Sequence, residues 1–319
     1  MTQPLYLTEA DVARLVTIKD AIACLEDVFA LWRDPGTTNL PRQRARLAAG
    51  AFNLMGAGCE AKDIFGLKAY FAGKGGARYH VLLYAGDGSG LTAMIEADLL
   101  GALRTGAASG LATRLLARPD ARTLGVVGTG KQARTQVAAV CAVRPIERVR
   151  VFSRSRENRT AFAFAVADEL GLETEPVESG EACVKDADVV VTITKSAEPV
   201  VQSAWLADGV HINAAGANSA DRREIDPDTV LRAAVRVTDH VAQAQGEAGE
   251  FRDLVGAGQL AWTDIDELGD LVTRQVRGRT SPSEVTLFKS LGIALEDIAF
   301  AKLIHRRAVE AKAGRPLPV

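Results

Sequence analysis

The chain has 319 residues, enough for two hydrophobic cores because a domain usually contains roughly 100–150 residues. Its 38 basic and 40 acidic residues give a formal net charge of −2, which gives no electrostatic support for a nucleic-acid or anionic-membrane partner. The cysteines are scattered, without a CxxC pair or a histidine at zinc-ligand spacing, so neither a disulfide framework nor a metal site is expected: Cys24, Cys59, Cys141 and Cys183.

The first ~115 residues predict an α+β lobe. Residues 1–16 carry acids where a signal peptide would carry lysines, and no apolar window approaches the ~20 residues that span a bilayer, so we expect a soluble cytoplasmic protein. An acid-capped helix is predicted over 8–32, followed by a strand around "NLPRQRARL", alternating segments at 65–71 and 79–96, and a helix over 96–117. In "FGLKAYF" the alternation places Phe65, Leu67, Ala69 and Phe71 on one face and Lys68 on the other.

The middle of the chain predicts a doubly wound α/β domain. Short runs rich in valine and isoleucine alternate with helical or irregular stretches, as buried parallel strands do: 123–128, 148–152, 187–194, 209–216 and 234–239. The tail over 283–313 predicts one long helix, with a candidate interruption at Gly292 and one apolar face: Leu287, Leu291, Leu295 and Ile298. Such a helix could return to the first lobe or pack against a second subunit.

A glycine-rich turn follows the first of these strands. "TLGVVGTGKQA" has Gly128, Gly130 and Ala133 in the GxGxxA spacing, which allows a tight turn, close approach to a pyrophosphate and close packing of helix on strand. A turn without a ligand is the alternative, but the repeated strand–helix units favour a dinucleotide. The next strand ends in "SRSR", where an NAD site usually has an acid, so Ser153 and Arg154, with Arg156 as a further candidate, favour the 2′-phosphate of NADP(H) over NAD(H), which stays possible. A solvated, arginine-rich helix start is the alternative.

Three further stretches carry candidate substrate contacts. Lys68 is the one charged side chain in "FGLKAYF" and could face a carboxylate, while a surface lysine is the alternative. Arg104 precedes a run of small residues in "LRTGAASG" and suits a carboxylate or a phosphate. "HINAAGANSAD" ends a buried strand with Asn218, an amide that cannot exchange a proton, and with Asp221, which is either an acid or a turn cap.

Taken together, these blocks resemble the ornithine cyclodeaminase/mu-crystallin family, in order and over nearly the whole chain. They are "PRxR", "FGLKAY", "ALRTGAASG", "GVVGTGKQAR", "HINAAGANSADRREID" and "LFKSLGIALED". The resemblance implies a homodimer whose substrate-binding and dimerisation domain comprises 1–116 with 292–319, and whose Rossmann dinucleotide-binding domain comprises 117–291.

The resemblance also implies residue roles. Arg42, Arg44, Lys68 and Arg104 would clamp a substrate carboxylate, with Leu291 near the substrate. The cofactor contacts would be Thr105, Gly128, Thr129, Gly130, Lys131, Gln132, Ser153, Arg154, Ser155, Thr194 and Ala214. Cyclodeaminases and alanine dehydrogenases of the family have an aspartate where this chain has Asn218, and Asp221 is a candidate substitute.

An amide at this position favours reduction of an imine made elsewhere. The expected function is an NADPH-dependent reductase of a cyclic imino acid such as Δ1-pyrroline-2-carboxylate, or a related L-amino-acid dehydrogenase, with Lys68, Asn218 and Asp221 as candidate catalytic residues. The alternatives are an ornithine or lysine cyclodeaminase that releases ammonia with catalytic NAD, another small-molecule oxidoreductase such as an opine enzyme, and a non-catalytic ligand-binding protein.

Overall fold

The computed structural model describes residues 3–318, and the chain divides into two compact units. Unit 1 comprises the residues up to Arg104 together with those from Ile293 onward, and unit 2 is Thr105–Gly292. The chain passes from one unit to the other inside helix α3 (Asp98–Leu116). The sequence break at Pro119 comes after this helix. The boundary between the two compact units, by contrast, falls within the helix, between Arg104 and Thr105.

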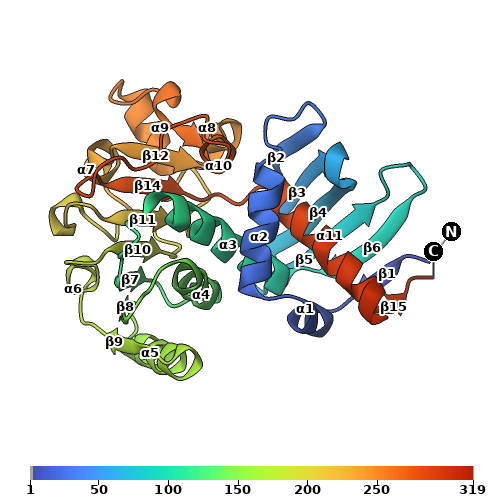
Figure 1. The fold of residues 1–319 in the computed structure, drawn as a ribbon, viewed down its shortest axis with the longest axis horizontal. Helices are drawn as coiled ribbons and strands as arrows, with labels where there is room; N and C mark the ends of the chain where they lie inside the picture. The colour runs from blue at the N-terminus through green and yellow to red at the C-terminus, as the bar shows by residue number, and fades with distance from the viewer. Residues whose placement is uncertain (1–2, 319) are drawn as a thin grey trace. The chain divides into compact units, whose positions relative to one another are not determined.

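Unit 1 contains a mixed sheet covered on one face by helices (Figure 1). Within residues 3–318 its strand order is β15-β1-β6-β5-β4-β3-β2, and all pairings are antiparallel except that of β1 with β6. The strands are β1 (Leu5–Leu7), β2 (Thr37–Leu47), β3 (Gly50–Cys59), β4 (Ile64–Gly73), β5 (Gly76–Tyr84), β6 (Leu91–Glu96) and β15 (Arg315–Pro316). Helices α2 (Ile18–Phe29) and α11 (Ala294–Ala311) pack together, and α11 crosses β2 to β5.

The N-terminal helical region is two helices where the sequence predicted one. Helix α1 (Glu9–Leu15) and α2 each begin with a capping box, formed by Thr8 with Asp11 and by Thr17 with Asp20. The single-helix prediction was wrong because Thr17 accepts a hydrogen bond from the Asp20 backbone and so starts a second helix.

Strand β4 has the predicted alternation of its side chains. Its apolar face is the more exposed one, however, and the face that carries the lysine is buried. Phe65 is 54% exposed, whereas Lys68 is 2% exposed. The face that carries Lys68 lies under α11, and the surface-lysine alternative is therefore wrong.

Unit 2 is a doubly wound α/β unit, as predicted. Within the described chain its strands are all parallel and ordered β13-β12-β14-β11-β10-β7-β8-β9. They are β7 (Thr123–Val127), β8 (Arg148–Phe152), β9 (Glu173–Pro176), β10 (Val189–Thr192), β11 (His211–Ala214), β12 (Val235–Thr238), β13 (Asp266–Glu267) and β14 (Thr286–Lys289). The strand order reverses between β7 and β10, where open α/β sheets bind their ligands beyond the carboxyl ends of the strands.

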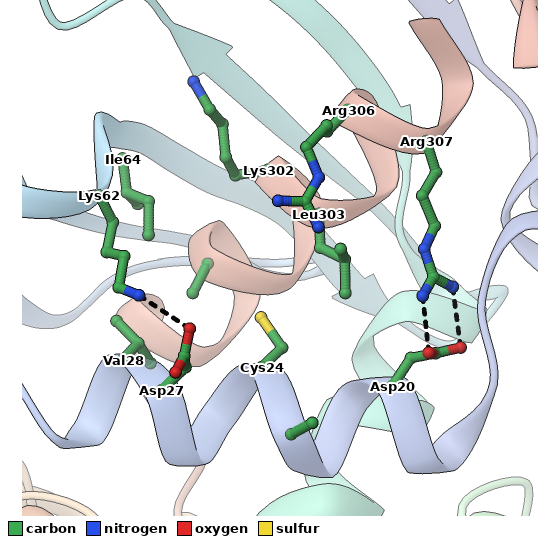
Figure 2. A pocket seen from close by; sticks show the side chains of 12 residues that line it. Asp20, Cys24, Asp27, Val28, Lys62, Ile64, Lys302, Leu303, Arg306 and Arg307 are labelled. Atoms are coloured by element: carbon green, nitrogen blue, oxygen red, sulfur yellow. Dashed lines mark hydrogen bonds and ion pairs between the residues drawn. The ribbon is translucent and has the colours of Figure 1, made fainter. Parts of the chain in front are cut away.

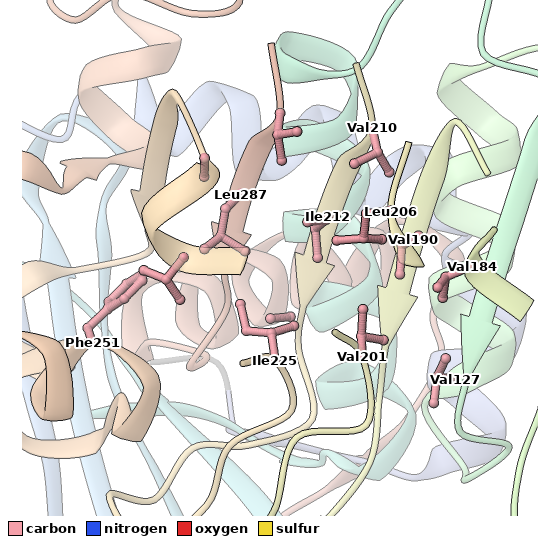
Figure 3. Packing of buried hydrophobic residues seen from close by; sticks show 14 of the residues in the cluster. Val127, Val184, Val190, Val201, Leu206, Val210, Ile212, Ile225, Phe251 and Leu287 are labelled. Carbon is pink, nitrogen blue, oxygen red and sulfur yellow. The ribbon is translucent and has the colours of Figure 1, made fainter. Parts of the chain in front are cut away.

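Helices and short turns join these strands on both sides of the sheet (Figure 1). They are α4 (Ala133–Val143), α5 (Arg156–Leu170), α6 (Gly180–Val184), α7 (Pro227–Arg232), α8 (Val241–Glu247), α9 (Gly249–Gly256) and α10 (Leu268–Val272). Alternate residues of one strand enter different cores: Val190 packs in the cluster that Figure 3 shows with Ile212 and Leu287, while Val189 and Val191 pack in the other. The central strands are therefore buried on both faces, which explains why β7 and β10 are nearly continuous apolar runs.

The predicted long C-terminal helix was wrong in its first third. Residues 286–289 form β14 between β11 and β12, and the helix begins only at Ala294. A short apolar run has the same sequence signature in a buried strand as in a buried helix, so periodicity alone could not separate them. Leu287 lies in the strand and Leu291 in the following loop, and neither belongs to a helical face with Leu295.

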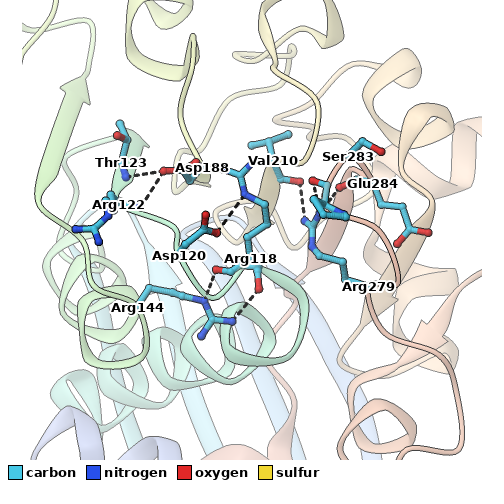
Figure 4. A network of polar contacts seen from close by, with 12 residues as sticks. Arg118, Asp120, Arg122, Thr123, Arg144, Asp188, Val210, Arg279, Ser283 and Glu284 are labelled. Atoms are coloured by element: carbon cyan, nitrogen blue, oxygen red, sulfur yellow. Dashed lines mark hydrogen bonds and ion pairs between the residues drawn. The ribbon is translucent and has the colours of Figure 1, made fainter.

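Arginine side chains and one aspartate form hydrogen bonds at the end of the unit 2 sheet where the parallel strands begin (Figure 4). Arg144 donates to the backbone oxygens of Arg114, Ala117 and Arg118 at 2.8 Å each, and so caps the end of α3. Asp188 accepts from the backbone of Arg122 and Thr123. Among the described residues, no helix is long and apolar enough to cross a membrane.

A buried histidine in β11 predicts acid sensitivity. His211 is fully buried, with ring nitrogens 2.9 Å from Thr286 Oγ1 and 3.3 Å from Asn213 Oδ1, and burial lowers its pKa to about 3 from 6.5. Below pH 6.5 this histidine is protonated in the unfolded chain, whereas in the folded chain it stays neutral down to about pH 3. The free energy of unfolding therefore falls between pH 6.5 and 3, by at most about 1.4 kcal/mol per pH unit. We expect His211→Gln to flatten this slope in urea unfolding at pH 7 and pH 5; an unchanged slope would exclude His211 as its source.

Candidate active site

The glycine-rich turn lies at the carboxyl end of β7, where the strand order reverses. Gly128 has φ +112°, and a Cβ there would overlap the Ile193 carbonyl, so the turn itself requires this glycine. A Cβ on Gly130 would meet no described protein atom within 4 Å, so packing does not explain that glycine, whereas the approach of a ligand does. Gln132 precedes α4 without a side-chain cap among the described residues, which leaves backbone N–H groups for an anion. The turn therefore fits the pyrophosphate of a dinucleotide.

The other predicted residues of this turn differ in exposure. Thr129 and Gln132 are half-buried and Lys131 is exposed. Thr105 is buried, and its carbonyl accepts a hydrogen bond from Gln136 Nε2 at 3.2 Å, which joins α3 to α4 inside unit 2.

The turn after β8 exposes a cation. The buried Arg159 donates to the Ser153 carbonyl at 3.1 Å and pairs with Glu178, and so holds the turn from behind. Ser153 Oγ donates to the Ser155 carbonyl at 3.1 Å, and Ser155 caps α5. Arg154 is exposed and makes no ion pair within residues 3–318. Its guanidinium is therefore available to a phosphate.

A buried carboxylate joins the loops that follow β10 and β11. Glu224 Oε1 accepts from Thr194 N at 2.6 Å and from Thr194 Oγ1 at 2.8 Å, and Oε2 accepts from Gly216 N at 2.6 Å and Ala217 N at 3.2 Å. Glu224 is fully buried, and burial raises its pKa although Lys289 opposes the shift. A Cβ on Gly216 would overlap the Thr194 backbone, so only glycine lets the two loops come this close. This carboxylate thus fixes the backbone around two predicted cofactor positions, Thr194 and Ala214.

Lys289 supports the same loop from β14. Its Nζ donates to the Ala217 carbonyl at 2.7 Å and to Glu250 Oε1 at 3.1 Å, and both side chains are fully buried or nearly so. Asn218 follows directly and is half-buried. Asp221 is exposed and accepts a hydrogen bond from Ser219 within a turn, so it caps no helix.

The loop after β14 is held by an acid that follows β12. Asp239 Oδ2 accepts from Leu291 N at 2.7 Å and from Gly292 N at 2.5 Å, and Gln243 Nε2 donates to the Gly292 carbonyl at 3.1 Å. Leu291 itself is 4% exposed, so the predicted substrate position belongs to the buried end of unit 2.

Unit 1 brings the predicted cations Lys68 and Arg104 together on a carboxylate that the sequence did not identify. Lys68 Nζ lies 2.6 Å from Asp297 Oδ1, and Arg104 Nε donates to the same oxygen at 2.9 Å. Arg104 Nη1 also donates to Glu296 Oε2 at 2.9 Å. All four side chains are at most 8% exposed, and they come from β4, α3 and the first turn of α11.

Arg42 adds a third cation to this cluster. It is 8% exposed and lies close enough to Lys68 to lower the pKa of that amine, as does Arg104. The structure thus brings three of the four predicted cations close together in unit 1, and such a group of cations can bind a carboxylate. Arg44, by contrast, donates to Asn53 Oδ1 at 3.2 Å along the strand pair.

Burial sets the protonation of the cluster. It lowers the pKa of Lys68 to about 8 even though Asp297 opposes the shift. Burial alone would lower the pKa of Arg104, but Asp297 and Glu296 raise it above its usual value. Lys68 can therefore carry a proton at neutral pH and release it readily, as a catalytic acid must.

The sequence interpretation missed the acids that hold these sites: Glu224, Glu250, Asp239, Glu296 and Asp297. Lys68 and Asp297 are 229 positions apart, so no local pattern connects them. A weak signal was present in "ALEDIA", where two adjacent acids interrupt an otherwise apolar segment.

A hollow of about 460 Å³ in unit 1 has a different lining (Figure 2). It lies between α2 and α11, and its residues include Cys24 and Arg306 but none of the predicted site residues. Its other charges are largely paired: Lys62 with Asp27 at 2.7 Å, and Arg307 with Asp20. This surface therefore lacks the concentrated charge of the Lys68 cluster.

The fold and the site define a class of protein. One unit has a doubly wound parallel sheet of the kind that binds dinucleotides, and the other is an α+β unit with a buried cluster of cations. Residues 2–312 match the model of the ornithine cyclodeaminase/mu-crystallin family, and the chain belongs to this family. The predicted family and fold class are thus confirmed.

Relatives and solved structures are similar over much of the chain. A Δ1-pyrroline-2-carboxylate reductase of Bacillus cereus is 37% identical over 223 residues, 70% of this chain and 68% of that protein. The Δ1-pyrroline-2-carboxylate reductase of Thermococcus litoralis in complex with NADH and L-proline has a TM-score of 0.94 and 31% identity, and the match covers 98% of this chain and 100% of that one. An archaeal alanine dehydrogenase dimer with bound NAD has a TM-score of 0.93 and 28% identity, with 99% of each chain covered. These solved complexes contain NADH or NAD, so a preference for NADP(H) stays a prediction.

Proposed function

We propose that this chain is an NADPH-dependent reductase of a cyclic imino acid, with Δ1-pyrroline-2-carboxylate as the first candidate and a related L-amino-acid dehydrogenase reaction as the variant. The observation that carries the proposal is the buried cluster of Arg42, Lys68 and Arg104, because three cationic side chains that lie close together suit a substrate carboxylate. The names of the relatives support it, since they include reductases of this imine.

The chain's own residues have three tasks in this reaction. Arg104 and Arg42 bind and orient the carboxylate, and Lys68 provides the proton that the imine nitrogen needs. The dinucleotide, when bound, supplies the hydride. Asn218 can orient a nitrogen but cannot act as a base, and Asp221 remains a second candidate for proton transfer.

A spectroscopic assay separates this proposal from the cyclodeaminase alternative. With Δ1-pyrroline-2-carboxylate, the absorbance of NADPH should fall in proportion to the proline formed. A cyclodeaminase would instead release ammonia from ornithine with only catalytic NAD. A protein that binds NADPH but turns over neither compound would be a ligand-binding member of the family.

Cofactor preference gives a separate prediction. The exposed Arg154 and the neutral Ser153 favour the 2′-phosphate, so NADPH should bind more tightly than NADH in a fluorescence titration. Arg154→Ala should weaken NADPH binding by about tenfold and leave NADH binding unchanged. Arg148→Ala is the matched control, because Arg148 is an exposed arginine at the opposite end of β8 and pairs with Glu173 at 3.1 Å. Tighter binding of NADH by the unaltered protein would refute the preference.

A homodimer is proposed from an exposed apolar face of unit 1. Register places six large apolar side chains of β2, β3 and β4 on the side of the sheet away from Lys68, each 37–60% exposed: Leu40, Leu47, Phe52, Leu54, Phe65 and Phe71. Apolar patches of this kind mark interfaces, and the alanine dehydrogenase relative is a dimer. Analytical ultracentrifugation tests the proposal, since a monomeric mass at micromolar concentration would contradict it.

A further inference from the structure

Asp297 is the acid in contact with the proposed proton donor. One of its oxygens, Oδ1, accepts from both Lys68 Nζ at 2.6 Å and Arg104 Nε at 2.9 Å. Its side chain is 0% exposed and that of Lys68 is 3% exposed. The pair is therefore largely shielded from bulk water and salt, and in such surroundings a single charge has its largest effect on a neighbour.

We propose that Asp297 is a positioning residue that keeps the Lys68 side chain charged and in place, so that Lys68 can deliver a proton to the imine nitrogen of the substrate. This inference rests on the proposed imine reduction and assigns its proton-transfer half to a particular pair of residues. Asp297 acts through Lys68.

Burial and two neighbouring guanidinium groups oppose the charge of Lys68, and Asp297 is the main group that favours it. Arg104 from α3 and Arg42 from β2 repel it, and burial removes its hydration. The Tyr79 ring from β5 lies 5.2 Å from Nζ and gives a weak attraction. Glu296 contacts Arg104. Within residues 3–318, Asp297 is thus the carboxylate that directly offsets burial and two guanidinium groups.

The second oxygen of Asp297 has spare hydrogen-bonding capacity. Oδ2 is buried and accepts no hydrogen bond from any described residue. A buried carboxylate oxygen without a donor is costly, so a water molecule or an N–H group of the substrate would be stabilised there. The carboxylate can therefore hold Lys68 with one oxygen and accept a further donor with the other.

The step balances with groups already named. The imine carbon accepts the hydride, the π electrons of the C=N bond move to nitrogen, and that nitrogen takes a proton from the Lys68 ammonium. The product is the neutral secondary amine, and Lys68 is left as a neutral amine that solvent reprotonates. A charge on Asp297 favours this reprotonation, because the cation is restored beside an anion.

The pH dependence of two matched variants tests the proposal. In the unaltered protein, kcat/KM should fall above about pH 8 as Lys68 loses its proton. Asp297→Asn should move this fall to lower pH by at least about one unit, and Asp297→Glu should restore it. Glu296→Gln removes an equally buried charge that contacts Arg104 and not Lys68, so it should raise KM without moving the fall.

Two results of this experiment would overturn the proposal. One is that the fall of kcat/KM at high pH occurs at the same pH in Asp297→Asn as in the unaltered protein. The other is that Glu296→Gln moves this fall by as much as Asp297→Asn does. The second result would mean that the overall charge of the cluster, rather than contact with Asp297, sets the protonation of Lys68.

A titration without substrate separates this proposal from the proposed function, and its first measurement is made on the unaltered protein. Lysine labelled with ¹³C at Cε reports the charge of Lys68 by NMR, with Lys68→Arg for assignment. The unaltered protein should keep Lys68 charged up to about pH 8, and Asp297→Asn should lower that midpoint. A Lys68 already neutral at pH 7 would refute the proposal. The expected titration in a protein that reduces no imine would refute the proposed function instead.

Discussion

Arg104→Ala is expected to lower kcat/KM for the imino acid by roughly 30- to 1000-fold, corresponding to about 2–4 kcal/mol of lost transition-state binding. The side chain is 8% exposed and makes charged hydrogen bonds to both Glu296 and Asp297. Its removal deletes the proposed contact with the substrate carboxylate and leaves two buried acids, Glu296 and Asp297, with less compensation. The free energy of unfolding should therefore also fall, by about 3–5 kcal/mol.

A control substitution shows whether the losses in kcat/KM and stability are specific to Arg104 or follow from the removal of any arginine. Arg46 lies on the same face of β2 as Arg44 but is exposed, so Arg46→Ala should leave kcat/KM and stability unchanged. Δ1-Pyrroline, which lacks the carboxylate, sharpens the test, because Arg104→Ala should reduce its turnover much less. An equal loss for both imines would remove Arg104 from carboxylate binding.

Glu224→Gln should weaken dinucleotide binding and destabilise the protein. The carboxylate accepts four hydrogen bonds from the Thr194, Gly216 and Ala217 segments. An amide in its place presents an N–H₂ group to one of the two loops and leaves backbone donors unsatisfied, at about 1–3 kcal/mol each. We expect a loss of about 2–5 kcal/mol in the free energy of unfolding by urea, and at least about tenfold weaker NADPH binding by fluorescence.

Glu198→Gln is the control for this substitution. Glu198 follows β10 in the same loop region, but its side chain is exposed, so both measurements should match those of the unaltered protein. Normal NADPH affinity in a folded Glu224→Gln protein would show that the cofactor does not depend on how these two loops are joined.

Much of unit 2 could be predicted because its strands and its glycine-rich turn are marked by patterns within a few consecutive residues. β7, β8, β10 and β12 are short valine-rich runs, and GxGxxA marks the turn after β7. β9, with the sequence ETEP, has no such run and was not predicted. Failures occurred where local patterns are ambiguous. Residues 286–289 resemble a helix segment until their neighbours β11 and β12 are known. The break between α1 and α2 depends on one hydroxyl, that of Thr17.

The candidate site was predictable only in part. Lys68 and Arg104 are exceptional for their segments and could be singled out, as could Asn218. Their partners could not be found, because Glu296 and Asp297 reach them only after α11 packs on the unit 1 sheet. The role of Glu224 has the same origin, since it joins two loops that are neighbours only in the folded sheet.

The transfer of deuterium from the cofactor tests the central claim most directly. The protein is incubated with Δ1-pyrroline-2-carboxylate and NADPH that carries deuterium at both hydrogens of nicotinamide C4, and the proline formed is examined by mass spectrometry. The proposed reduction predicts L-proline with one deuterium at Cα, formed in equal amount to the NADPH consumed. Proline without deuterium, or no proline despite bound NADPH, would contradict it.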